Sequence, residues 1–490
     1  MSIKYKFKTK PFDHQRTAFD ESWDRPFYAL FMEMGTGKSK VAIDTMGALY
    51  LEGKIAGAIV IAPKGVYDNW VEGEIPTHLP EEIQRIVLRW EPAKSKKYYK
   101  ELEQISNVLR TELKILVINT EAFSSRKGAK AAYDFMASIK NSGQKILTIV
   151  DESTSIKNRK AIRTKNIIAL GGDKYSDYRR ILTGSPITKS PMDLFSQCNF
   201  LDEKALGFNS YYAFQNRYAI IQKRTMGHHS FQEITGYRRL DELNEKLDRI
   251  SSRVLKEDCL DLPDKTYVTR NVPMSAEQER LYLQMKKLAL AQFDNGELST
   301  TASVLTQLMR LQQICCGFLK TDDGEIQEVN NNRLDELMNV LSETNSKVII
   351  WATFTHDILR IVDEIKKVYG DDSVAAYHGD TPQDDRQEIV KTFQDEESSL
   401  RFFVGQPRTG GYGITLHAAK TVVYYSNSFD LEIRLQSEDR AHRIGQTSNV
   451  TYVDLVSTKT IDEKIIKALR KKSDLAGKVL GEDPRDWLAH

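Results

Sequence analysis

The sequence predicts an α/β protein with two doubly wound parallel-sheet domains and a helical region between them. Two blocks of the chain alternate short apolar runs with amphipathic, helix-like stretches, which is the pattern of βαβ units in a parallel sheet. The segment between these blocks has few apolar runs of strand length. The length of 490 residues suffices for about two to four domains.

Each block contains five predicted buried strands. In the first block they are residues 27–31, 58–62, 115–119, 145–150 and 180–182, and in the second block 347–352, 374–377, 402–404, 422–425 and 450–456. Residues 191–257 are polar and strand-poor, 262–271 are typical of a linker, and 275–343 are strongly helix-forming. The predicted domains are lobes at 1–200 and 346–460, helical protrusions at 201–262 and 273–345, a linker at 263–272 and a C-terminal brace at 461–490.

Composition describes a globular protein with little net charge. The 70 Lys and Arg residues against 68 Asp and Glu give a net charge of +2, which by itself offers no support for a nucleic-acid partner. Four cysteines cannot form a disulfide framework, so we expect a reducing compartment, the cytoplasm of a bacterial or phage-infected cell or else the nucleus. Neither a membrane span nor a secretory signal is expected, because the chain has no long apolar run and none follows its first lysines.

The sharpest local pattern is the run Gly35-Thr36-Gly37-Lys38-Ser39, which follows a predicted strand and opens a predicted helix. Glycines let the backbone approach phosphate oxygens, and amide groups at a helix start complement negative charge. Lys38 could reach the β- and γ-phosphates, and the Ser39 hydroxyl could bind magnesium. The alternative is an ordinary loop that binds no phosphate, which the position of the run between a predicted strand and a predicted helix disfavours.

An acidic pair, Asp151 and Glu152, directly follows the strand predicted at residues 146–150. Asp151 is placed to hold magnesium through water, and Glu152 to orient or deprotonate an attacking water. A single such pair is more often a solvated turn. Together with the glycine-rich run, in this order, it predicts a site for ATP or GTP.

Arg440 and Arg443 are three residues apart, and Gln436 precedes Arg440 by one helical turn. If the segment is helical, the two arginines lie on one face and could bring positive charge to a γ-phosphate. In isolation, arginines with this spacing are usually solvated on a surface helix. Their assignment therefore depends on the other motifs of the chain.

In order along the chain, these motifs resemble those of the Swi/Snf-type family of helicase-like ATPases in superfamily two. The segments that carry the resemblance are PFDHQ, MGTGKS, IVIAPKGVYDNW, VDESTSIKN, LTGSPITKSPMDLFSQCNFL, KVIIWATFTHDIL, YHGDTPQDDRQEIVKTF, VGQPRTGGYGITLHAA and QSEDRAHRIGQ. The chain departs from the usual DEAH-like motif at Ser153 and Thr154, while the acidic pair is kept. The departure puts coupling to the LTGSP segment in doubt, but not hydrolysis.

The resemblance implies two RecA-like lobes with ATP and magnesium between them. The ATP-binding residues that it implies are Gln15, as the adenine reader, Gly35, Thr36, Gly37, Lys38, Ser39, Gly413 and Gln436. The implied catalytic residues are Lys38, Asp151, Glu152, Arg440 and Arg443, with magnesium at Ser39 and Asp151. Coupling is implied at Thr183, Gly184 and Ser185, and contacts with DNA phosphates at Lys64, Thr409, Gly410 and Gly411. Basic clusters at 94–100 and 157–165 either extend this DNA track or are solvated faces.

The function expected from the resemblance is a DNA-dependent ATPase that translocates on double-stranded DNA. A true strand-separating helicase on DNA or RNA is the alternative within this class, and a non-hydrolysing nucleic-acid scaffold is the alternative from another class. The motifs run from Gln15 to Gln446, so we expect a compact motor in replication, repair or recombination of a bacterium or phage rather than a chromatin remodeller. The sequence does not specify protein partners.

Overall fold

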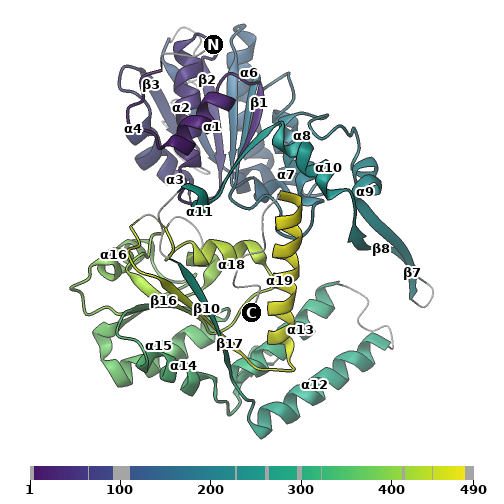
Figure 1. The fold of residues 1–490 in the computed structure, drawn as a ribbon, viewed down its shortest axis with the longest axis vertical. Coiled ribbons are helices and arrows are strands. Elements are labelled where there is room, and N and C mark those ends of the chain that lie inside the picture. The colour runs from purple at the N-terminus through teal and green to yellow at the C-terminus, as the bar shows by residue number, and fades with distance from the viewer. Residues whose placement is uncertain are drawn as a thin grey trace. The chain divides into compact units, whose positions relative to one another are not determined.

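The computed structural model of the chain describes residues 5–64, 66–91, 111–226, 229–259, 264–294, 301–321, 323–410, 414–443 and 445–480. The chain divides into two compact units (Figure 1), the first comprising Met1–Asp261 with Asp474–Asp483 and the second Leu262–Ser473 with Pro484–His490. Within the described ranges, no helix combines the length and the apolar character needed to cross a membrane.

The first unit is built on a parallel sheet with the strand order β3-β4-β2-β5-β6-β1-β9. Its strands are β1 (Phe27–Met32), β2 (Gly57–Ala62), β3 (Arg85–Arg89), β4 (Leu113–Asn119), β5 (Ile146–Asp151), β6 (Tyr178–Leu182) and β9 (Ser251–Val254). Its helices are α1 (Asp13–Ser22), α2 (Lys38–Leu51), α3 (Tyr67–Asn69), η1 (Trp70–Glu74), α4 (Ile75–His78), η2 (Thr120–Ser124), α6 (Arg126–Asn141), η3 (Ser153–Ile156), α7 (Ile162–Leu170), α8 (Asp193–Leu201), α9 (Tyr211–Tyr218), α10 (Leu240–Asp248) and α11 (Lys256–Cys259).

Both faces of this sheet are covered, which explains its continuous apolar strands. In β2, Ile59 and Ile61 pack into the core that α6, α7 and α8 cover, whereas Val60 packs into the core under α1 and α2. Successive side chains of a strand point to opposite faces, so a strand buried on both faces is mostly apolar. The first unit therefore has the doubly wound arrangement that the sequence predicts.

The second unit has its own parallel sheet, in the order β10-β17-β16-β13-β15-β14. Its strands are β10 (Lys265–Asn271), β13 (Lys347–Trp351), β14 (Val374–Tyr377), β15 (Phe402–Gly405), β16 (Ala419–Tyr424) and β17 (Val450–Val456). Its helices are α12 (Ala276–Asp294), α13 (Thr301–Cys316), α14 (Arg333–Ser342), α15 (Thr355–Tyr369), η4 (Asp371–Ser373), α16 (Gln383–Gln394), α17 (Pro407–Gly410) and α18 (Leu431–Glu438). The last helix, α19 (Ile461–Leu480), belongs to the second unit up to Ser473 and to the first from Asp474. Two parallel sheets with covering helices confirm the predicted α/β class.

Each of the ten predicted strands overlaps a strand of the structure, and three of them run one residue past it, at Lys145, Ala352 and Tyr425. Three further strands of the two parallel sheets, all at sheet edges, were not predicted. β3, β9 and β10 each pair with a single neighbour, so they need no apolar side chains on both faces. β10 occupies most of the residues expected as the linker and pairs with β17 along its whole length, which corrects that expectation.

The segment expected as a helical protrusion at 201–262 is mixed rather than helical. It contains α9, α10 and α11, the edge strand β9, and an antiparallel hairpin of β7 (Ala219–Met226) and β8 (His229–Tyr237). Figure 1 shows this hairpin extending away from the sheet of the first unit. In the second predicted protrusion, a short hairpin of β11 (Phe318–Lys320) and β12 (Ile326–Glu328) lies between α13 and α14.

Candidate nucleotide site

The glycine-rich run forms the loop between β1 and α2, at the carboxyl end of the sheet. Gly35 and Gly37 have φ values of 86° and 89°, a region in which side chains are strained. A Cβ atom on Gly37 would also lie 2.2 Å from Nε2 of Gln15. Thr36 is buried between the two glycines, and its hydroxyl donates to the carbonyl oxygen of Glu33 at 2.7 Å. The loop conformation thus requires both glycines and leaves its amides at the start of α2.

The first turn of α1 is fastened to this loop by two side chains. Gln15 donates Nε2 to the carbonyl oxygen of Thr36 at 3.0 Å, and its Oε1 accepts from the amide of Phe12 at 3.1 Å. His14 places Nε2 at 2.8 Å from the same carbonyl oxygen. The structure places Gln15 beside residues 33–38, the loop predicted to bind phosphate and called the phosphate loop below, and the role of Gln15 in reading adenine remains a prediction. Sequence reasoning missed His14, although it stands next to Gln15 in PFDHQ.

The acidic pair lies at the end of β5 and contacts the phosphate loop lysine. Lys38 Nζ is 3.2 Å from Oε1 of Glu152, and both side chains are buried. Asp151 accepts from Nε1 of Trp70 at 2.8 Å and from the amide of Glu152 at 2.9 Å. Burial raises the pKa of Asp151, while Lys38 and these two donors act in the opposite direction. Trp70 was recognised as part of a motif, but only the fold reveals its contact with the carboxylate.

Glu152 has a left-handed backbone with φ of 45° and ψ of 62°. Residues other than glycine adopt this region at a cost of about 1–3 kcal/mol, and they concentrate at functional sites. The conformation carries the chain from β5 into η3 with the Glu152 carboxylate directed at Lys38.

The oxygen donors at this position fit magnesium. The Asp151 carboxylate is buried at the strand end, and Ser39 lies in the first turn of α2 with a partly exposed side chain. Carboxylate and hydroxyl oxygens are the hard ligands that Mg²⁺ binds in combination with substrate phosphates. The predicted metal residues therefore suit a Mg²⁺–nucleotide complex.

The segment predicted to couple hydrolysis to movement, Thr183 to Ser185, follows β6. The amide of Ser185 donates to the Thr183 hydroxyl at 3.1 Å. A Cβ atom on Gly184 would lie 3.1 Å from the backbone nitrogen of Met34, so this segment touches the phosphate loop. Arg253 of β9 donates to the carbonyl oxygen of Gly184 at 3.0 Å and to a carbonyl of β1 at 2.9 Å.

The predicted arginines belong to the second unit, at the end of α18. The condition for a shared helix face, a helical segment, is not met, because α18 ends at Glu438 and the arginines follow it, Arg440 in a turn and Arg443 in a bend. They converge nevertheless on one carbonyl: Arg440 Nη1 and Arg443 Nη1 lie 3.0 and 3.3 Å from the oxygen of Ile414. Arg440 also donates Nε to the carbonyl oxygen of Gln436 at 3.1 Å.

The predicted DNA contacts are described only in part. The Lys64 side chain is exposed, and its amide donates to Oε2 of Glu121 at 3.2 Å. Thr409 donates its hydroxyl to Oε1 of Gln406 at 3.3 Å in α17, which ends at Gly410. Gly411, the ATP-site residue Gly413 and the basic cluster at 94–100 lie outside the described residues.

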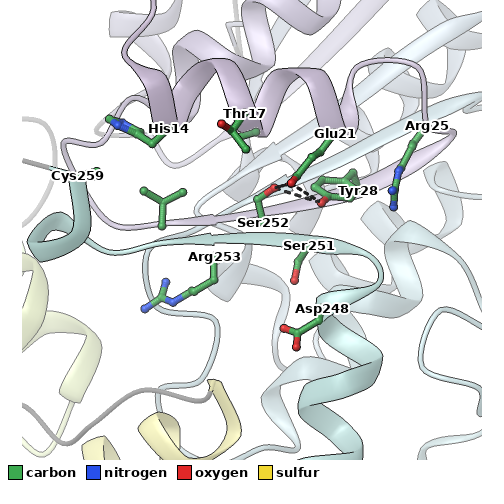
Figure 2. A pocket seen from close by; sticks show the side chains of 12 residues that line it. His14, Thr17, Glu21, Arg25, Tyr28, Asp248, Ser251, Ser252, Arg253 and Cys259 are labelled. Carbon is green, nitrogen blue, oxygen red and sulfur yellow. Dashed lines mark hydrogen bonds between the residues drawn. The ribbon is translucent and has the colours of Figure 1, made fainter. Parts of the chain in front are cut away.

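A polar groove of about 570 Å³ lies in the first unit between α1 and β9 (Figure 2). On its α1 side, Glu21 accepts hydrogen bonds from the Ser252 hydroxyl at 2.8 Å and from the Tyr28 hydroxyl at 3.3 Å. Its other end is formed by His14, which also contacts the phosphate loop, and Arg253 lines the opposite wall. This groove was not predicted, because β9 was not recognised as a strand.

Comparison with protein families finds two matches that together cover most of the chain. Residues 29–318, more than half of the chain, match the model of the SNF2-related domain, and residues 330–445 match the helicase conserved C-terminal domain.

Individual relatives match over nearly the whole chain. The transcription regulatory protein SNF2 of Saccharomyces cerevisiae is 27% identical over 91% of this chain and 26% of its own length. An uncharacterised ATP-dependent helicase of Mycoplasma genitalium is 24% identical over 92% of this chain and 40% of its own length. A Bacillus subtilis protein with the provisional name ATP-dependent helicase/translocase YwqA is 25% identical over 93% of this chain and 46% of its own length. The chain thus spans about a quarter to a half of the length of these relatives.

A solved structure, the SWI2/SNF2 ATPase core of Sulfolobus solfataricus in complex with double-stranded DNA, is 23% identical. The alignment covers 98% of this chain and 94% of that one, with a TM-score of 0.42.

Proposed function

Because the chain belongs to the SNF2-related family of helicase-like ATPases, we propose that it hydrolyses ATP with magnesium and moves along double-stranded DNA. The observation that carries the ATPase assignment is the buried contact between Lys38 and Glu152, next to Asp151. This contact brings the lysine of the loop after β1 next to the acidic pair at the end of β5. Nucleotide hydrolysis requires a lysine that binds the phosphates close to acidic groups that hold magnesium and position water.

Each residue of this cluster has a distinct proposed role. Lys38 binds the β- and γ-phosphates of ATP, which compete with the Glu152 carboxylate for its ammonium group. Glu152, released from the ion pair, orients the attacking water and accepts its proton. Ser39 and Asp151 would hold magnesium, which neutralises the charge that develops on the phosphates when it is bound. Trp70 keeps the Asp151 carboxylate aimed at this position.

The nucleoside end of ATP is proposed to lie beside α1. Gln15 and His14 both contact the phosphate loop, and His14 also lines the groove between α1 and β9. A ligand whose phosphates occupy the loop would therefore reach polar groups of α1 and β9. We assign the adenine-reading role to Gln15.

The second unit is proposed to act on the same nucleotide and on DNA. Arg440 and Arg443 would supply positive charge to the γ-phosphate, with Gln436 and Gly413 completing the ATP site. On DNA, Lys64 of the first unit and residues 409–411 of the second would contact phosphates, so recognition would be independent of base sequence. The helicase names of the bacterial relatives support a nucleic-acid motor.

We place this motor in DNA replication, repair or recombination in the cytoplasm of a bacterial or phage-infected cell. The matches to bacterial proteins named as helicases support this setting.

The test is ATP turnover without nucleic acid and with duplex DNA, single-stranded DNA or RNA, alongside strand-displacement and triplex-displacement assays. Duplex-stimulated turnover and triplex displacement without unwinding are expected. Unwinding of a duplex would instead indicate a strand-separating helicase, and stimulation by RNA alone would contradict the DNA assignment.

The catalytic residues are tested in the same assay. Lys38→Ala and Glu152→Gln should each lower turnover by about three orders of magnitude, the second with ATP binding retained. The exposed residues Lys145 and Glu52 provide matched controls as Lys145→Ala and Glu52→Gln, which should leave turnover unchanged. Wild-type turnover in either site variant would overturn the assignment.

A further inference from the structure

A fully buried glutamine of α8 links the acidic segment to the segment that follows β6. Ser153 donates its hydroxyl to Oε1 of Gln197 at 2.7 Å, and both side chains are inaccessible to solvent. The amide group of Gln197 donates Nε2 to the carbonyl oxygens of Pro186 at 2.8 Å and Asp193 at 2.9 Å. Both amide hydrogens and the amide oxygen of Gln197 are thus used.

The two residues that Gln197 connects, Ser153 and Pro186, are each adjacent in the chain to a residue of the proposed site. Ser153 directly follows Glu152, whose backbone is left-handed, and Pro186 directly follows Ser185. Any change in the backbone at Glu152 therefore acts on Ser153, and through Gln197 on the carbonyl of Pro186.

A second connection runs parallel to the first. Lys157 donates Nζ to the Thr188 hydroxyl at 2.7 Å, while the Thr188 amide donates to Oδ2 of Asp193 at 3.0 Å. The same carboxylate oxygen accepts from the amides of Lys189 and Ser190 at 2.7 and 3.3 Å. The first turn of α8 therefore holds both the segment after the acidic pair and the segment after β6.

The start of the segment contacts the phosphate loop at Gly184, and Arg253 joins the Gly184 carbonyl to that of Phe31 at the end of β1. Residues 183–188 thus bridge the two parts of the site that act on nucleotide phosphates. In a water-excluded interior, a displaced hydrogen-bonding group finds no replacement partner. Displacement of one segment therefore either carries the other along or leaves the amide of Gln197 unsatisfied.

We infer that Gln197 is a positioning residue that couples the acidic pair to residues 183–188, through the Ser153 hydroxyl and the Pro186 carbonyl. This inference rests on the proposed function, since it assigns a route by which hydrolysis reaches the coupling segment. The link is made by Ser153, the fourth residue of the VDEST motif, where the sequence departs from the family pattern.

The test is a double-mutant cycle with Ser153→Ala and Gln197→Leu. Each single variant should lower DNA-stimulated kcat by about tenfold with the KM for ATP changed less than about twofold, because the phosphate loop is untouched. The double variant should regain part of the stability lost in Gln197→Leu, because the Ser153 hydroxyl that lost its acceptor is removed as well, but it should not recover kcat. Ser153→Thr, which keeps the hydroxyl, should retain coupling.

Gln278→Leu is the matched control, because Gln278 is a buried glutamine whose amide binds the carbonyl oxygens of Ile314 and Cys315 in the second unit. It should lower stability and leave the ratio of stimulated to basal turnover unchanged. A double variant with wild-type kcat would show that the pair is merely structural and would overturn the inference.

Amide hydrogen exchange, without nucleotide or DNA, separates this inference from the proposed function. Either single variant should raise exchange in both segments, 151–157 and 183–190, relative to the wild type. A rise confined to the substituted segment would overturn the link even if the wild type hydrolyses ATP. Absence of wild-type ATP turnover would refute the proposed function, and the exchange result would still decide the link.

Discussion

Asp357, in the first turn of α15, is a buried carboxyl group whose ionisation opposes folding. Its side chain is inaccessible, and Oδ1 lies 3.3 Å from Nη2 of Arg360. Burial raises the pKa of Asp357 to about 7, although Arg360 and Arg333 favour the charged form. The folded state therefore binds a proton more tightly than the unfolded state, whose carboxyl titrates near pH 4. The stability that this group contributes is present at low pH and is lost as the pH rises from about 4 to 7.

Asp357→Asn replaces the titrating carboxyl group with a neutral amide, so the pH-dependent contribution of this residue to stability should disappear. The unfolding free energy of the wild type minus that of Asp357→Asn should fall by about 2 kcal/mol between about pH 5 and pH 8. Urea denaturation at both pH values measures it. The exposed Asp363 on the same helix, changed to Asn, is the matched control. Parallel behaviour of the wild type and Asp357→Asn would contradict a raised pKa.

At the scale of elements, β10 is held to the second sheet by a buried carboxylate as well as by its backbone. Glu438, at the end of α18, accepts from the Tyr267 hydroxyl at 2.9 Å and from Nε of Arg434 at 2.8 Å. Lys265 Nζ lies 3.4 Å from the same carboxylate. Burial favours the neutral form of Glu438, but the positive charges of Lys265 and Arg434 outweigh this effect. The pKa of Glu438 is therefore below its usual value. The charged carboxylate thus fixes an edge strand that a purely apolar pattern would not have predicted.

Tyr267→Phe removes one donor to this buried carboxylate and tests the attachment of β10. A hydrogen bond to a charged group contributes about 1.5–3 kcal/mol to stability. The free energy of unfolding of the second unit, measured in urea, should therefore fall by a comparable amount. Tyr212→Phe, at an exposed tyrosine, is the control and should change stability little. If both variants unfold like the wild type, the contact with Glu438 does not stabilise the strand.

At the scale of the whole molecule, a net charge of +2 does not describe the charge that DNA would meet. Residues 153–172 include Lys157, Arg159, Lys160, Arg163 and Lys165 and no acidic residue. Lys160 and Lys165 are exposed, and Arg159 lies over the ring of Tyr211 at 4.1 Å. A local basic surface of this kind binds phosphates, while acidic residues elsewhere balance the total.

Duplex binding should consequently be modest without nucleotide, dependent on salt and independent of sequence. If the protein neutralises a few DNA phosphates, raising the salt concentration from roughly 50 to 200 mM should lower its affinity for DNA by at least about tenfold. Fluorescence anisotropy with two unrelated duplexes measures both properties. An affinity that is insensitive to salt, or that differs strongly between the duplexes, would contradict recognition through the backbone.

The sequence by itself determined the interior strands of both sheets, the phosphate loop and the acidic pair. Strands buried on both faces must be continuously apolar, and a tight phosphate loop requires glycines, so both leave a local pattern. Neighbouring residues in the chain suffice to recognise such features.

Only the tertiary structure decided the edge strands β3, β9 and β10 and the contacts that orient the acidic segment. Trp70 and Asp151 are 81 residues apart in the chain, and Ser153 and Gln197 are 44 apart. A tryptophan N–H or a buried glutamine has no characteristic spacing from its partner, because the fold rather than the local chain brings the two together. An edge strand likewise needs apolar side chains only where its single neighbour and the core cover it. The residues of the proposed site could therefore be found in the sequence, whereas the groups that position them became visible only in the fold.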